Sequence, residues 1–163
     1  TKYMDEIESL IKDNRPSKII STDKTIEDPS VFALEKHLED FLVANWDQTI
    51  LGKEYDIFEE EGELVGQQFL SDTGPIDILA KDKETNDYVV IELKRNQTSD
   101  DTVGQVTRYM GWVKRKLNDP NVKGIIIASG YDKKLEYALE YVQNVDVFTY
   151  EVDFKLKGFK GKI

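Results

Sequence analysis

The chain has 163 residues, 22 lysines and arginines against 32 aspartates and glutamates, a formal net charge of -10, and no cysteine. These counts exclude a disulfide framework, a zinc–thiolate site and a cysteine nucleophile, and the single histidine, His37, disfavours a histidine triad or a polyhistidine metal site. The hydrophobic share of 39% supports a core. No apolar run approaches the ~20 residues of a membrane helix, so we expect a soluble, cytoplasmic domain without a membrane partner.

The N-terminal part of the chain has the pattern of a short amphipathic helix followed by a link. We expect a helix over residues 2–14, stopped before Pro16, and a polar link over residues 17–28 in which Ile19 and Ile20 form a small strand. The interpretation is an N-terminal helix and linker over residues 1–30 and one compact domain over residues 31–163.

A second helix follows, with Ser30 as its N-cap and an end near Asn45 or Trp46. Its apolar residues recur at spacings of three, four and one, which predicts a continuous stripe packed on the rest of the domain. The stripe consists of Val31, Leu34, Leu38, Phe41 and Leu42.

The middle of the chain has the alternation and turn residues of a strand meander. Residues 54–69 form a predicted hairpin whose acidic turn spans 59–63, and Gly74-Pro75 ends that unit. Strands are then expected over residues 76–80 and 88–94, joined by a short polar turn.

The second half of the chain alternates between helical and extended patterns. After a polar loop over residues 97–101 we expect a helix over 101–117, a fully buried strand over 122–129, a helix over 133–142 and a strand over 145–156. A meander followed by a crossover helix and a buried strand predicts an α/β fold with a mixed sheet flanked by helices.

The anomalous residues are Glu92 and Lys94, which lie within an otherwise apolar strand and share one face with Val90. An unpaired carboxylate buried among aliphatic side chains costs several kcal/mol or loses its charge, so Glu92 needs a cation or a metal beside it. The alternative at this point is an edge strand whose Glu–Lys face is solvated.

Asp77 is a second acid among aliphatic residues, on the strand directly before the one that carries Glu92. The short connection predicts antiparallel pairing, which brings the two carboxylates to adjacent positions if the register allows. Two carboxylates with Lys94 two residues beyond one of them suit a hard cation such as Mg²⁺, which keeps several waters and takes oxygen ligands.

These motifs, in this order, resemble the core of the PD-(D/E)XK nucleases, and most closely the catalytic domain of NucS-type, RecB-like endonucleases. The resemblance covers roughly residues 31–129 and rests on the stretches Leu34-Glu35, Gly74-Pro75-Ile76-Asp77-Ile78-Leu79-Ala80, Val90-Ile91-Glu92-Leu93-Lys94-Arg95 and Val103-Gly104-Gln105-Val106-Thr107-Arg108-Tyr109-Met110-Gly111-Trp112. It implies a restriction-endonuclease-like α-β-β-β-α-β core and a DNA endonuclease that uses Mg²⁺ or Mn²⁺.

The resemblance also implies roles for individual residues. Asp77 and Glu92 would bind the metal with the backbone carbonyl of Leu93, and Lys94 would be the catalytic lysine. Glu35 would be the acid of the first helix, with Glu39 as second choice. Gln105, which would orient Lys94 or the water, and Tyr109, which would contact the substrate, match a Gln-x-x-x-Tyr motif and share a helix face.

Charge gives a mixed indication of the partner. The negative balance favours a protein partner over DNA, yet local basic residues survive: Arg95 and Arg108 near the expected site, the run Lys114-Arg115-Lys116, and Lys155, Lys157, Lys160 and Lys162 in the tail. If DNA binds, the basic residues near the site would contact phosphates. The chain could also form a homodimer.

Three functional hypotheses follow. The first is metal-dependent hydrolysis of DNA, with single-stranded, flap, mismatched and branched substrates all open, in DNA repair or processing. The second is a non-catalytic nucleic-acid- or protein-binding module of the same fold. The third is a purely structural domain, which a solvent-exposed Glu92 would favour. We expect His37 on the surface, and Trp46 and Trp112 in packing roles instead of base stacking.

Overall fold

The computed structural model describes residues 29–152 and 156–159, with side chains from Leu34 onward. The predicted N-terminal helix, linker and small strand lie outside these residues, as do three of the four tail lysines. Among the described residues, no helix is both long and apolar enough to cross a bilayer.

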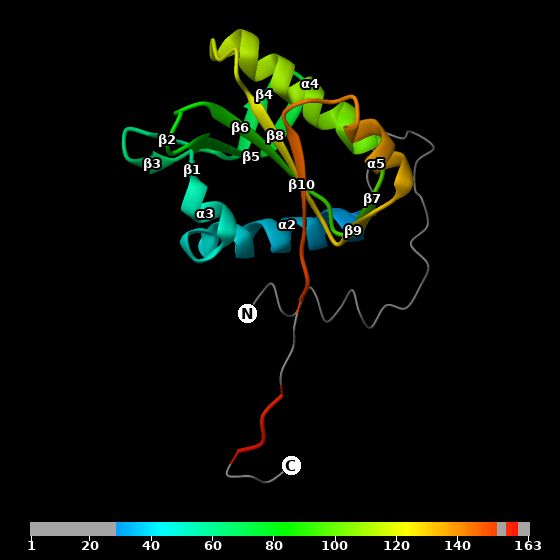
Figure 1. Ribbon diagram of the computed structural model, residues 1–163. Coiled ribbons are helices and arrows are strands. Elements are labelled where there is room, and N and C mark those ends of the chain that lie inside the picture. Colours follow the sequence, from blue (N-terminus) through cyan, green and yellow to red (C-terminus); the bar gives the residue numbers. More distant parts are fainter. Residues whose placement is uncertain (1–28, 153–155, 160–163) are drawn as a thin grey trace.

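A six-stranded mixed sheet forms the centre of the molecule (Figure 1). Its strand order is β1-β5-β6-β8-β10, with β4 also paired to β5; β1, β4 and β6 run antiparallel to β5, whereas β6, β8 and β10 are parallel. These strands are β1 (Tyr55–Ile57), β4 (Gln67–Ser71), β5 (Gly74–Asp82), β6 (Tyr88–Leu93), β8 (Lys123–Ala128) and β10 (Val145–Thr149). The fold class predicted from the sequence, a mixed sheet flanked by helices, is confirmed.

One face of the sheet is covered by α2 (Pro29–Ala44), the 3-10 turn η1 (Trp46–Gln48) and α3 (Ile50–Glu54) (Figure 1). From β6, the side chains of Val89, Ile91 and Leu93 point into this core, where Leu38 of α2 packs against them. Trp46 is buried here and its indole N–H donates to the carbonyl of Tyr55 at 2.9 Å, so the packing role predicted for it is confirmed.

The other face is covered by α4 (Asp101–Lys116) and α5 (Lys133–Leu139) (Figure 1). Val90 of β6 and Val106 and Val113 of α4 are buried in this second core, and Trp112 packs edge-on against Phe69. Helix α4 has an acid in its first turn and three basic residues in its last, which complements the helix dipole. It is the crossover between the parallel strands β6 and β8, as the sequence pattern predicts.

Strands β4 and β5 kink together at the pair Gln68 and Asp77. Gln67 pairs with Ile78 and Phe69 with Ile76, but the residues between them make no ladder pair. Ile76 packs in the α4 core and Ile78 in the α2 core, although two residues apart on a regular strand would share a face. At this kink, the side chains of β5 no longer alternate regularly between the two faces of the sheet.

Several element boundaries differ from the predicted ones. Gly74 and Pro75 lie inside β5 instead of ending a unit, because β5 pairs with β4 as far as Gly74. The loop predicted after β6 contains β7 (Gln97–Thr98), which pairs with β9 (Gly130–Tyr131). Strand β10 already ends at Thr149, where its pairing with β8 ends.

The acidic run is confirmed as a solvated tip, but the hairpin is shorter than the predicted 54–69, because β1 and β4 pair with β5 and not with each other. The hairpin consists of β2 (Glu59–Glu60) and β3 (Glu63–Leu64), all exposed, and its turn residues Glu61 and Gly62 both have positive φ. His37 differs from the expectation, since it is half-buried with its Nδ1 shielded from solvent. It follows Leu34 by three residues and so lies at the margin of the packed helix face.

Candidate active site

Asp77 and Glu92 face each other at the point where the ladder between β5 and β6 ends. The register pairs Ile78 with Ile91, which makes Asp77 and Glu92 the next opposing positions. The Asp77 N–H lies 3.4 Å from Glu92 Oε1, and the Leu93 N–H donates to Asp77 Oδ2 at 2.9 Å. The predicted antiparallel pairing is therefore confirmed, and the Asp77 carboxylate takes up a backbone N–H of the neighbouring strand.

Burial sets the electrostatics of this pair. The exposed fraction of Glu92 is only 1%, which rules out the alternative that its face is solvated. Loss of hydration, and then the charge of Asp77, raise the pKa of Glu92 to about 9. Loss of hydration also raises the pKa of Asp77, to about 6, with the Leu93 N–H opposing the shift. Two ionised carboxylates are thus unfavourable here unless a cation accompanies them.

The pair lies at the floor of a cleft of about 1360 Å³. The cleft takes its walls from both helical layers: Glu35, Lys36 and Glu39 come from α2, and Gln105, Arg108 and Tyr109 come from α4. The segment that follows β6 adds Lys94 and four uncharged polar residues, Asn96, Gln97, Thr98 and Ser99, to the lining. The structure therefore brings together seven of the residues singled out in the sequence: Glu35, Asp77, Glu92, Lys94, Gln105, Arg108 and Tyr109.

On the α4 wall, Tyr109 is 4% exposed and lies near the carboxylate pair. Burial and the charge of Glu92 raise the pKa of its phenol, whereas hydrogen bonds with Arg108 and Gln105 act in the opposite direction. Gly74 has φ +124°, and a Cβ built there would lie 3.3 Å from the Tyr109 hydroxyl. A glycine at this position lets the β4–β5 turn approach the phenol closely.

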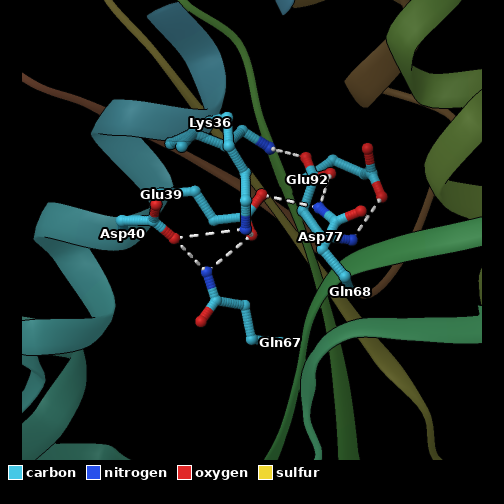
Figure 2. A network of polar contacts seen from close by, with 8 residues as sticks. Lys36, Glu39, Asp40, Gln67, Gln68, Asp77 and Glu92 are labelled. Atoms are coloured by element: carbon cyan, nitrogen blue, oxygen red, sulfur yellow. Dashed lines mark hydrogen bonds and ion pairs between the residues drawn. The ribbon is translucent and has the colours of Figure 1, made fainter. Parts of the chain in front are cut away.

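On the α2 wall, the two acids have different surroundings. Glu35 is half-buried and its Oε1 accepts the Arg95 N–H at 3.2 Å. Glu39 is buried and joins a polar network with Lys36, Gln67 and Gln68 (Figure 2). Glu39, the second choice from the sequence, is therefore the α2 acid that this network connects to Asp77.

Two predicted residues take part through their backbones. The Leu93 N–H donates to Asp77, and the role predicted for the Leu93 carbonyl as a metal ligand stays a prediction. Arg95 is not among the residues that line the cleft, because its N–H is held by Glu35 and its carbonyl accepts the Tyr150 hydroxyl. Its assignment to substrate binding also stays a prediction.

The donor set fits a hard divalent cation. Within the described residues, no three histidine, aspartate or glutamate side chains are close enough together to enclose an ion. A metal at this site would rest on the carboxylates of Asp77 and Glu92, with backbone oxygen and water completing its shell. That is the binding mode Mg²⁺ favours, and its charge would offset the burial and the Asp77 charge that together raise the pKa of Glu92.

Sequence reasoning missed the amides of the network, Gln67 and Gln68, and the cation Lys36. Lys36 Nζ lies 3.1 Å from Glu39 Oε1 and 3.1 Å from Asp40 Oδ1. The only signal in the sequence was a pair of adjacent amides on a half-buried strand. Such a pair becomes informative once β4 is known to lie under α2.

Comparison with known proteins identifies the family. Residues 35–151 match the endonuclease NucS C-terminal domain. Endonuclease NucS of Methanocaldococcus jannaschii is 37% identical over 73 residues, 45% of this chain and 27% of that protein. Endonuclease NucS of Sulfolobus acidocaldarius is 32% identical over 119 residues, 69% of this chain and 42% of that protein. The chain thus spans less than half the length of these curated relatives.

Solved structures share the fold. A structure of an EndoMS–dsDNA complex superposes with a TM-score of 0.59 at 18% identity, covering 74% of this chain and 46% of that one. The crystal structure of a repair endonuclease from Pyrococcus abyssi gives a TM-score of 0.57 at 21% identity, covering 71% and 46%. With a match that extends over most of its length, the chain belongs to the family of the endonuclease NucS C-terminal domain.

Proposed function

We propose that this domain hydrolyses phosphodiester bonds of DNA with a divalent ion, Mg²⁺ or Mn²⁺, held by Asp77 and Glu92. The observation that carries the proposal is the meeting of two carboxylates, the buried Glu92 and the half-buried Asp77, on neighbouring strands that line a polar cleft, with Lys94 on the same cleft. Membership of a family whose named relatives are endonucleases supports it.

The PD-(D/E)XK assignment of the residues gives each a part in this chemistry. A divalent ion bound there would supply Lewis-acid stabilisation of the phosphate and lower the pKa of a bound water. Lys94 places an ammonium beside the phosphate, where it stabilises developing negative charge. Gln105 orients Lys94 or the water, and Tyr109 and Arg108 bind the substrate backbone from the α4 wall.

DNA is the proposed substrate in spite of the net charge of -10. The cleft lining holds three cations, Lys36, Lys94 and Arg108, beside five acids, and a divalent ion bound at Asp77 and Glu92 would offset the charge of two of these acids. The structural relatives include a protein solved with double-stranded DNA and one described as a repair endonuclease. A role in DNA repair is therefore proposed with the activity.

The test is cleavage of labelled single-stranded, double-stranded, flap, mismatched and branched oligonucleotides with Mg²⁺ or Mn²⁺. Asp77→Ala, Glu92→Ala and Lys94→Ala should each abolish cleavage, while Glu63→Ala on the exposed hairpin serves as the matched control. Persistent cleavage by all three variants would refute the assignment. DNA binding without metal-dependent cleavage by the wild type would instead support a non-catalytic module.

A further inference from the structure

Gln68 has a backbone conformation that side-chain-bearing residues rarely adopt. Its φ is +53°, in the left-handed region, and it lies opposite Asp77 at the kink of β4 and β5. Such a conformation is disfavoured for a residue with a Cβ and persists only where the surrounding structure enforces it. Gly and Asn are the residues that usually occupy this region, so a glutamine here calls for a reason in its side chain.

The Gln68 amide bridges two carboxylates that come from different layers. Its Nε2 donates to Glu39 Oε2 at 2.7 Å and to Asp77 Oδ1 at 3.3 Å (Figure 2). Ionised carboxylates only accept hydrogen bonds, and the amide nitrogen carries two hydrogens, one for each partner. The chemistry of the partners therefore fixes which end of the amide faces them.

Asp77 is consequently held at both of its oxygens. Leu93 N–H occupies Oδ2 at 2.9 Å, and Gln68 occupies Oδ1. Glu39 in turn is held by Lys36 of the same helix at 3.1 Å, a contact that does not depend on Gln67, so the bridge ends on α2. The Asp77 carboxylate has little freedom to rotate in this arrangement.

We infer that Gln68 is a positioning residue, which fixes the orientation of the Asp77 carboxylate and couples it to α2 through Glu39. The inference rests on the proposed function, because it assigns Gln68 to the support of a residue that would bind the metal. Residues that hold metal ligands in place commonly change metal affinity by tenfold or more when they are removed.

The neighbouring residue Gln67 provides a matched control. Its Nε2 donates to Glu39 Oε1 at 2.9 Å and to Asp40 Oδ1 at 2.6 Å, but it makes no recorded contact with Asp77. Gln67→Ala therefore removes an amide of the same type, from the same strand and the same network. Any effect specific to Asp77 should be confined to Gln68.

The experiment measures Mn²⁺ affinity of the full chain by calorimetry. Gln68→Ala and Gln68→Gly should each weaken binding about tenfold, whereas Gln67→Ala should keep it within about twofold. Glycine adopts a positive φ without strain, so Gln68→Gly should melt no lower than Gln68→Ala. A loss of Mn²⁺ affinity in both variants is then due to the missing amide and not to a strained backbone. Unchanged affinity in both Gln68 variants, or an equal loss in Gln67→Ala, would overturn the inference.

A second measurement needs no metal. In EDTA, the Tm change of the double variant Gln68→Ala/Asp77→Ala should differ from the sum of the two single changes, because the two residues interact. The Tm change of Gln67→Ala/Asp77→Ala should equal the sum of its single changes. Additive shifts for Gln68 and Asp77 would overturn the inference. Failure of the wild type to bind Mn²⁺ would instead overturn the proposed function, and the melting cycle would still decide whether Gln68 holds Asp77.

Discussion

Replacing Glu92 with glutamine should stabilise the metal-free protein. Burial and the charge of Asp77 raise the pKa of Glu92 from 4.5 to about 9, so at pH 7 the carboxyl is protonated in the folded protein and ionised in the unfolded chain. The folded state then binds more protons, and the free energy of unfolding falls as the pH rises from 4.5 toward 9.

The size of the effect follows from the same values. At about 1.4 kcal/mol per pH unit, the stability lost between the ordinary pKa and pH 7 is roughly 3 kcal/mol. Glutamine has the same shape and no proton to take up, so Glu92→Gln should recover most of this free energy. For a chain of this size the gain corresponds to a rise of roughly 6–12 °C in Tm.

The assay is thermal and urea denaturation in EDTA at several pH values from 5 to 8. The advantage of Glu92→Gln over the wild type should be smallest at pH 5 and should grow with pH. Glu63→Gln, on the exposed hairpin, should follow the wild type at every pH. A Glu92→Gln protein that is less stable than the wild type at pH 7, or that keeps the wild-type pH dependence, would refute the reasoning.

Three further predictions concern the site and the fold. Lys94→Met should lower cleavage by roughly 100-fold or more while the variant still binds Mn²⁺ by calorimetry, since it removes the ammonium and neither carboxylate. Mn²⁺ affinity of the wild type should rise with pH between about 6 and about 9, with proton release, because Asp77 and Glu92 must ionise to bind; a pH-independent affinity would contradict this. Gly66→Ala should cost more than about 2 kcal/mol in urea denaturation, because its Cβ would lie 2.2 Å from the Leu79 carbonyl oxygen, whereas Gly111→Ala, with open space around it, should not destabilise.

The sequence predicted the parts of the fold that depend on regular alternation. In β6 the alternation assigned Val90 to one face and Ile91 to the other, as the two cores confirm, whereas the sequence pattern left open whether Glu92 is buried or solvated. The apolar run of β8 and the preceding helical pattern predicted a buried strand reached by a crossover, which the parallel pairing with β6 confirms.

The sequence could not predict the features that depend on a break in alternation. Ile76-Asp77-Ile78 has the pattern of a regular strand, yet the kink puts the two isoleucines on opposite faces. The kink coincides with the left-handed backbone of Gln68 on the paired strand, and no local sequence pattern predicts a positive φ at a glutamine. Gln68 could not be identified from the sequence either, because its role depends on a hydrogen bond to Glu39, a residue far from it in the chain.

The cleft has two walls that pack in different hydrophobic cores. The carboxylate pair is tied to strands inside the sheet, whereas α2 packs on one core and α4 on the other (Figure 1). A change in the packing of α4 can therefore widen or narrow the entrance without altering the distance between the two acids, whereas α2 is linked to Asp77 through Glu39 and Gln68. Under the proposed function, this separation would let the shape of the accepted substrate vary in evolution while the two acids keep their geometry.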